Sequence, residues 1–187
     1  MAARARISRP VPALARAQGS WIAALEPWRG LGYRADALGR YLARKAHARG
    51  VWVVLASAKG PPVGIVVVDD GVLLGDFIAL LAVRPESSGQ GVGRTLVEHV
   101  AARTFAARRW LYVSCDGNNA AALRFYRKLG FSRVGRLPDL VREGRTEILL
   151  RKPAPRVASK IGTKPAANAG TKIPTAAARV GYHLGGS

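Results

Sequence analysis

Cysteine and other metal-binding residues are scarce in this sequence. Cys115 is the only cysteine among 187 residues, which excludes an internal disulfide and a metal site built from several cysteines. The three histidines, His47, His99 and His183, are scattered without the spacing of metal ligands. We therefore expect a protein that uses no metal.

Long apolar runs are lacking as well. The longest, Phe77–Val83, has the length of a strand and falls far short of the roughly 18 residues of a membrane-spanning helix. The arginine-rich opening, residues 1–17, lacks the apolar core of about 7–15 residues that a secretory signal needs. We expect no contact with a membrane, a cytoplasmic location, and a first strand within the opening segment.

Acidic residues are few: the sequence has 11 acidic and 30 basic residues, which gives a net charge of +19. The excess lies mainly in the flanks, and residues 151–187 carry seven basic residues and no acidic one. Arginine outnumbers lysine 23 to 7 beside abundant alanine, a composition that a GC-rich genome produces without selection for a partner. A weak contact with RNA or DNA through the basic C-terminal segment is the alternative interpretation.

The chain divides into a single folded domain over residues 1–152 and a tail over residues 153–187. The tail holds several prolines, many alanines and glycines, and almost no large apolar residue. Such a segment buries too little apolar surface to offset its ordering entropy, so we expect it to be disordered.

Hydrophobic patterning within the domain predicts a run of strands followed by alternating helices and strands, which is typical of an α/β fold with a mixed sheet. A turn at Asp69-Asp70-Gly71 is expected to join two strands, because Asp-Gly supplies the positive φ of a hairpin turn. Ser20 is expected to cap a short helix. The predicted strands are 7–12, 51–57, 63–68, 72–83, 110–115, 131–136 and 146–150, and the predicted helices are 20–26, 36–49, 91–108 and 119–129.

A glycine-rich loop lies between the strand that ends near Pro85 and the next helix. Gly89, Gly91 and Gly93 allow tight turns and remove the side chains that would keep a phosphate at a distance. The helix N-terminus adds unpaired N–H groups and the positive end of its dipole. The P-loop and dinucleotide patterns do not fit, so the residues alone leave an anion site and a ligand-free tight turn as alternatives.

Two motifs resemble those of GNAT N-acetyltransferases. The first is Val83-x-Pro85 followed by the glycine loop, which resembles the acetyl-CoA loop of this family. The family pattern Gln/Arg-x-x-Gly-x-Gly/Ala maps onto Ser88, Gly91 and Gly93, and Ser88 departs from it. The second motif resembles the family segment Asn-x-x-Ala-x-x-x-Tyr-x-x-x-Gly-Phe and is formed by Asn119, Ala122, Tyr126, Gly130 and Phe131. The resemblance covers roughly residues 5–152.

The resemblance implies a single α/β domain whose mixed, mostly antiparallel sheet is flanked by helices and splayed to admit the pantetheine arm of acetyl-CoA. Leu81 and Val83 would pair main-chain groups with that arm, while Asn119 and Tyr126 would line the thioester end. The loop residues that would hold the pyrophosphate are Ser88, Gly89, Gln90, Gly91, Val92, Gly93 and Arg94.

For catalysis, the resemblance implies that Tyr126 donates a proton or a hydrogen bond to the departing thiolate, although its position also suits a core aromatic. A carboxylate would help to deprotonate a lysine-like amine. Asp76 is the first candidate and Glu86 the second, and the alternative for each is an ordinary solvated acid at a turn or strand edge. A covalent route through Cys115 is disfavoured, because no histidine lies near it in the sequence.

We therefore expect an N-acyltransferase that moves an acetyl group from acetyl-CoA to a primary amine by direct attack in a ternary complex. The acceptor stays open among small molecules, protein N-termini and lysines, and the protein is expected to be a monomer or a homodimer. Two alternatives remain: a non-catalytic acyl-CoA sensor, and a nucleic-acid- or ribosome-associated protein that acts through its basic tail.

Overall fold

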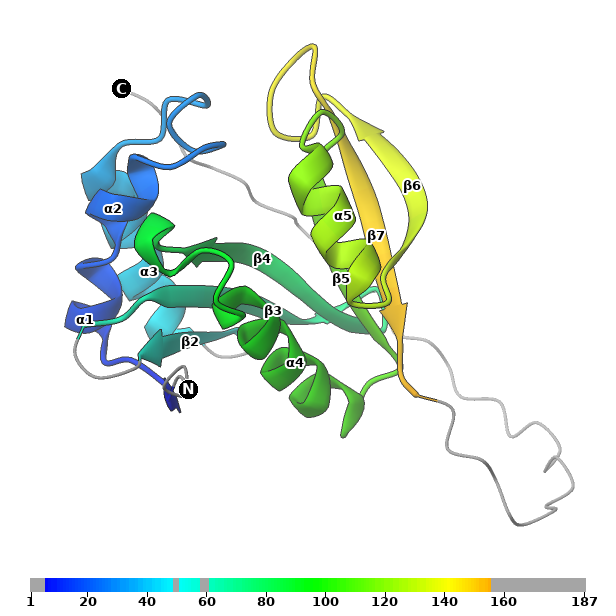
Figure 1. Ribbon diagram of the computed structural model, residues 1–187, viewed down its shortest axis with the longest axis horizontal. Coiled ribbons are helices and arrows are strands. Elements are labelled where there is room, and N and C mark those ends of the chain that lie inside the picture. The colour runs from blue at the N-terminus through cyan, green and yellow to red at the C-terminus, as the bar shows by residue number, and fades with distance from the viewer. Residues whose placement is uncertain (1–5, 49–50, 58–60, 156–187) are drawn as a thin grey trace, which may run out of the picture. The chain divides into compact units, whose positions relative to one another are not determined.

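The computed structural model describes residues 6–48, 51–57 and 61–155 (Figure 1). One compact unit extends to Pro155, and its last strand ends at Pro153, one residue beyond the predicted boundary. The predicted disorder of the tail concerns residues that, from Arg156 on, lie outside the described ones. Among the described residues, no helix is long and apolar enough to cross a membrane.

A seven-stranded mixed sheet forms the centre of this unit, with the order β1-β2-β3-β4-β5-β7-β6. Every neighbouring pair is antiparallel except β4 and β5, which run parallel. The predicted α/β class with a mixed, mostly antiparallel sheet is confirmed. The strands are β1 (Arg6–Ser8), β2 (Val51–Ser57), β3 (Gly64–Val72), β4 (Gly75–Val83), β5 (Trp110–Asp116), β6 (Ser132–Pro138) and β7 (Thr146–Pro153).

Helices cover both faces of the sheet. Alternate residues of β3 point to opposite faces, as strand geometry requires, so Ile65 packs with Leu42 of α3 while Val66 packs with Leu96 of α4. Figure 1 shows α4 and α5 in front of the sheet. The helices are α1 (Pro12–Arg16), α2 (Gly19–Ala23), α3 (Ala35–His47), α4 (Val92–Phe105) and α5 (Ala120–Lys128), with a 3₁₀ turn at η1 (Pro85–Ser87).

The parallel strands β4 and β5 separate halfway along their length. Within the described residues their pairing ends at Ile78 and Val113, although β4 continues to Val83 and β5 to Asp116. On its other side, β4 carries a bulge at Ala79, because Val67 pairs with Leu80 and Val68 with Ile78. A bulge bends its strand, so this extra residue turns the second half of β4 away from β5.

The predicted position of the hairpin turn is wrong. The β3–β4 hairpin turns at Leu73 and Leu74, both at positive φ, and not at Asp69-Asp70-Gly71. Gly71 uses its positive φ for an irregularity inside β3, so the strand continues past it.

The N-terminal elements also differ from their prediction. The first strand ends at Ser8, and Pro12 begins α1, because its fixed φ suits the first turn of a helix. Ser20 lies inside α2 and does not cap it, since that helix begins at Gly19.

Candidate active site

The glycine loop ends at the N-terminus of α4 with unpaired main-chain donors. Gly89 and Gly91 adopt φ values of 76° and 83°, in the left-handed region that favours glycine. The first hydrogen bond of the helix runs from Thr95 N to Gly91 O at 2.9 Å. The N–H groups of Val92, Gly93 and Arg94 therefore have no acceptor within the helix, which is the geometry that binds phosphate groups.

The two other predicted loop residues shape this turn from outside the helix. Ser88 N donates to Pro85 O at 3.0 Å, and the side-chain Nε2 of Gln90 donates to Glu86 O at 2.9 Å. Both residues are exposed, so the loop is held by short local hydrogen bonds and stays open to solvent. Its main-chain groups are accessible to a large anionic ligand.

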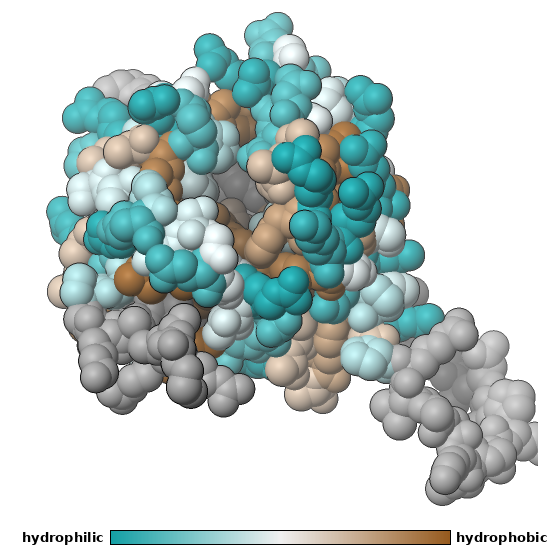
Figure 2. Space-filling view, viewed as in Figure 1, coloured by the Kyte–Doolittle hydropathy of each residue, from teal (hydrophilic) through white to brown (hydrophobic). Residues whose placement is uncertain are grey.

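Leu81 and Val83 lie on the part of β4 that has left β5. Both pair with β3 on one side, through Val66 and Gly64 respectively. Their other edge faces the opening, where no β5 partner is present within the described strands. Main-chain N–H and C=O groups in this position need a partner, and an extended amide chain provides one. Figure 2 shows the surface hollowed in this region, with hydrophobic residues on the walls of the hollow.

Tyr126 is buried in α5, where its ring makes edge-to-face contacts with Phe125 and Phe131 at centroid distances of 5.1 and 5.3 Å. Burial raises the pKa of the Tyr126 phenol above its usual value, and the nearby Cys115 adds to this shift. The phenol thus stays neutral at physiological pH and keeps its proton. Tyr126 is part of the core, and its role as a donor to the thiolate stays a prediction.

Cys115 lies close to Tyr126 but is a poor nucleophile. Burial raises the pKa of the Cys115 thiol to about 11, and the negative charges of Glu147 and Asp116 contribute. The reactive form of a cysteine is the thiolate, which is scarce at neutral pH under these conditions. A raised thiol pKa disfavours Cys115 as an acyl carrier.

Asn119 is the N-cap of α5. Its Oδ1 accepts a hydrogen bond from Ala122 N at 2.9 Å, so the side-chain oxygen is already engaged within the helix. This bond fixes the start of the helix that carries Tyr126. Asn119 thus helps to position α5 beside the opening.

The structure disagrees with the prediction that Asp76 is a general base. Asp76 lies in the half of β4 that pairs with β5, opposite Leu111, about 17 Å along the strand from Leu81. Its buried carboxylate accepts hydrogen bonds from Thr104 Oγ1 at 2.7 Å and Gly71 N at 3.3 Å. Arg108 approaches it at 3.9 Å. Asp76 therefore ties the β3–β4 hairpin to the end of α4, away from the opening.

Glu86, the second candidate, lies in the exposed 3₁₀ turn before the glycine loop. Its side chain is 66% exposed, and Arg84 Nη1 lies 3.9 Å from its Oε1. An acid in this position is solvated, which matches the alternative interpretation given for it above. Neither predicted carboxylate lies buried beside the opening.

Sequence reasoning missed a carboxyl that does lie near the opening. Glu147 of β7 is 9% exposed, lies diagonal to Ser114 of β5 on the same face of the sheet, and has its pKa raised by burial. No motif surrounds it. The available signal was the alternation of side chains along β7. Ile148 and Leu150 face the α4–α5 core, so Glu147, one residue before Ile148, must face the opposite side of the sheet.

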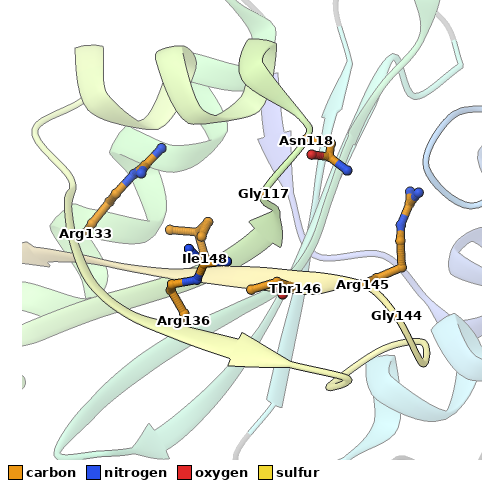
Figure 3. Close-up of a pocket in the computed structure, with 8 residues that line it drawn as sticks. All are labelled: Gly117, Asn118, Arg133, Arg136, Gly144, Arg145, Thr146 and Ile148. Atoms are coloured by element: carbon orange, nitrogen blue, oxygen red, sulfur yellow. The ribbon is translucent and has the colours of Figure 1, made fainter.

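Positive charge gathers near the end of β5 and the start of β7, in a cavity of about 270 Å³ that no carboxylate lines (Figure 3). Figure 3 shows the arginine side chains diverging, and Arg145 pairs with Asp116 at 2.8 Å. They do not converge on one ligand position. The lining consists of Gly117, Asn118, Arg133, Arg136, Gly144, Arg145, Thr146 and Ile148. Elsewhere too, no group of three or more metal-binding side chains occurs among the described residues.

Comparison with known proteins agrees with this geometry. A family model described as acetyltransferase (GNAT) domain matches residues 47–133, from the end of α3 to the start of β6. Peptidyl-lysine N-acetyltransferase YjaB of Salmonella typhimurium is 35% identical over 86 residues, which is 46% of this chain and 52% of YjaB. The chain thus spans about half the length of that curated relative.

Solved structures share the fold at low identity. The ribosomal-protein-S18-alanine N-acetyltransferase from Escherichia coli has a TM-score of 0.64 and 19% identity, over 85% of this chain and 99% of that one. An aminoglycoside 6'-N-acetyltransferase complexed with coenzyme A has a TM-score of 0.66 and 17% identity, over 80% and 97% of the two chains.

Proposed function

The chain carries a GNAT-family acetyltransferase domain, and on this premise we propose that it moves the acetyl group of acetyl-CoA to a primary amine. The single observation that carries the proposal is the unpaired α4 N-terminus beside the free edge of β4. A diphosphate and an extended amide chain are the two chemical features that these main-chain groups suit. Acetyl-CoA contains both, and it supplies the activated acetyl group.

The residues present fit this donor. The N–H groups of Val92, Gly93 and Arg94 would hold the pyrophosphate, and Leu81 and Val83 would pair with the pantetheine arm. A Cβ at Gly93 would lie 3.3 Å from Phe125 and 3.5 Å from Val83, so glycine keeps the loop close to both walls of the opening. This close approach supports a position for the pantetheine arm between the end of β4 and α5.

Tyr126 suits the departing sulfur. A neutral phenol with a raised pKa gives up its proton less readily than free tyrosine, while the usual pKa of a thiol is about 8.5. Complete protonation of the thiolate by Tyr126 is therefore uphill. We propose that Tyr126 donates a hydrogen bond that stabilises the thiolate as it leaves.

The acceptor must react as a neutral amine. For a lysine-like amine with a pKa of about 10.4, exposing the lone pair at pH 7 costs about 4.6 kcal/mol, whereas an α-amine near 7.8 costs about 1 kcal/mol. The relatives named above act, by their names, on peptidyl lysine, an alanine of ribosomal protein S18 and an aminoglycoside. We propose a primary amine of one of these three classes, attacked directly in a ternary complex.

A paired binding and turnover experiment tests the function. Calorimetry with acetyl-CoA is expected to show one site per chain. Thiol release and acetyl incorporation by mass spectrometry would then be followed with a lysine peptide, a peptide with N-terminal alanine, and an aminoglycoside. Turnover with at least one amine is expected. Binding without turnover on any of them would instead favour the acyl-CoA sensor, and absence of binding would overturn the assignment of the loop.

A further inference from the structure

Glu147 faces the opposite side of the sheet from Tyr126. Cys115 and Ile148 point toward the core beneath α5, and Figure 3 shows Ile148 on that side of β7. Glu147 pairs with Asp116 across β5 and β7, one residue away from Ile148 and Cys115. Because side chains alternate along a strand, Glu147, Asp116 and Ser114 share the other face.

The partner of Glu147 places it at the opening. Ser114 is the first β5 residue beyond Val113, where pairing with β4 ends. Ser114 pairs with Leu149, so it lies diagonal to Glu147 on the same face, and it lowers the raised pKa of that carboxyl. The carboxyl is thus held next to the point at which the two parallel strands separate, which is the region that Leu81 and Val83 border from the β4 side.

Two loops meet on the same side as Glu147. The segment between α2 and α3 contains Tyr33, whose pKa is raised by burial and by the charge of Glu147. The β6–β7 loop joins that segment through a hydrogen bond from Arg142 Nη1 to Gly30 O at 3.2 Å. Loops that vary freely without disturbing the sheet are suited to select an acceptor. The acceptor would therefore reach the opening from the face of Glu147.

Burial and the neighbouring charges together raise the pKa of the Glu147 carboxyl. Burial is the largest cause of its raised pKa, and Asp116 raises it further, while Ser114 and Arg145 lower it. Arg145 also pairs with Asp116 at 2.8 Å, which moderates the effect of that neighbour. Tyr33 faces the group from the α2–α3 segment, whereas Cys115 lies on the opposite face of β5. Buried carboxyls of this kind beside an opening are typical of acid–base sites.

We propose that Glu147 is the general base of the transfer and that Ser114 orients its carboxylate. The inference rests on the proposed function. As the amine nitrogen forms its bond to the acetyl carbon, the carbon–sulfur bond breaks and its electron pair leaves on sulfur. The proton lost by nitrogen passes to Glu147, directly or through one water, and the charge of the carboxylate is replaced by that of the thiolate. Tyr126 acts on that sulfur from the other side of the sheet.

The substitution Glu147→Gln tests this role, with the exposed Glu143→Gln as the matched control in the adjoining loop. For the acceptor that the wild type uses best, kcat/KM is expected to fall about 10²–10⁴-fold in Glu147→Gln and to stay unchanged in Glu143→Gln. Acetyl-CoA affinity should be equal in all three proteins. In Glu147→Gln the acidic limb of the kcat/KM profile should be set by the pKa of the amine alone, whereas the wild type and Glu143→Gln should also show the titration of the carboxyl.

Ser114→Ala provides a second test that survives if Glu147→Gln does not fold. Loss of the Ser114 hydroxyl removes an influence that lowers the pKa of Glu147, so the acidic limb should move to higher pH, which a purely structural role would not cause. Two results would overturn the role of Glu147 as general base. One is wild-type turnover by Ser114→Ala with an acidic limb at the wild-type pH, and the other is full activity of Glu147→Gln. Acetyl-CoA binding without wild-type turnover on any of the three amines would defeat the proposed transfer and this role together. The two failures are therefore distinguishable.

Discussion

Gly93 of α4 lies against Phe125 of α5, so that an added Cβ would stand 3.3 Å from the Phe125 ring. This contact joins the helix that begins at the glycine loop to the helix that carries Tyr126. Because β4 and β5 have separated here, the two helices bridge the opening where the strands do not. The width of the opening therefore depends on the side chain at position 93.

Gly93→Val is expected to force this contact apart. Added methyl groups in a packed contact typically cost about 1–3 kcal/mol, which should lower the melting temperature. Acetyl-CoA binding should weaken with it. The control is Gly135→Ala, since a Cβ at Gly135 meets no atom within 4 Å and its φ is not positive. Equal melting temperatures for the two variants would show that the contact does not constrain the helices.

Gly91→Glu is expected to abolish acetyl-CoA binding measured by calorimetry. Gly91 has a φ of 83°, so any other residue there would strain the backbone. No atom lies within 4 Å of an added Cβ, so the new side chain would not clash in the free protein. Its negative charge would lie at the helix N-terminus and compete with the pyrophosphate. Gly91→Ala separates the two effects, because it has the same backbone strain without the charge and should retain weaker binding. Equal loss in both variants would implicate the backbone alone.

Tyr126→Phe is expected to lower kcat about 10–10⁴-fold while the affinity for acetyl-CoA barely changes. Phenylalanine keeps the edge-to-face contacts with Phe125 and Phe131, so the melting temperature should also stay close to that of the wild type. Steady-state kinetics with a confirmed acceptor and calorimetry give the two readouts. An unchanged kcat would return Tyr126 to the role of a core aromatic.

Asp76→Ala is expected to reduce stability and leave the chemistry intact. It removes a buried, charge-assisted hydrogen bond from Thr104 and leaves the hydroxyl without that acceptor, at a cost of about 1.5–3 kcal/mol. Chemical denaturation measures this loss. The kcat of the folded variant should equal that of the wild type. A kcat lower by a factor of 10² or more at full stability would restore Asp76 as a base.

Local signals were sufficient to predict part of this site. Glycines before a helix indicated the loop at Gly91, which does precede α4, and the helix predicted from Asn119 is α5, with Asn119 as its N-cap. The placement of Asp76 failed for a physical reason. Sequence shows that it shares a strand with Leu81, but only the pairing register shows which half of that strand remains bound to β5.

The role of Glu147 depends on contacts that are distant in sequence. Its burial results from pairing with β5, and its position at the opening results from where β4 leaves that strand. The hairpin is similar, because the irregularity at Gly71 depends on alignment with β4 and moves the turn to Leu73 and Leu74. Local patterns predict elements and their caps, and they contain little information on register.

The predicted polyanion contact of the tail leads to a last experiment. Residues 156–187 carry Arg156, Lys160, Lys164, Lys172 and Arg179 without an acid, so electrostatic binding to RNA would weaken steeply with salt. A chain ending at Pro155 keeps β7 and the hydrogen bond from Ala154 N to Arg109 O at 2.8 Å. It should retain its melting temperature and its activity on a small amine, but lose RNA binding at low salt in a filter-binding assay.

The matched control is the full chain with Lys160, Lys164 and Lys172 changed to glutamine, which keeps the length and removes three charges. If charge carries the contact, this variant should bind RNA more weakly than the wild type, with a smaller slope of log affinity against log salt, since fewer counterions are released. Undiminished RNA binding by the chain ending at Pro155 would move the contact to the folded domain. The diverging arginines of β6 would then be the next residues to substitute, because Arg133 and Arg136 line a cavity without a carboxylate.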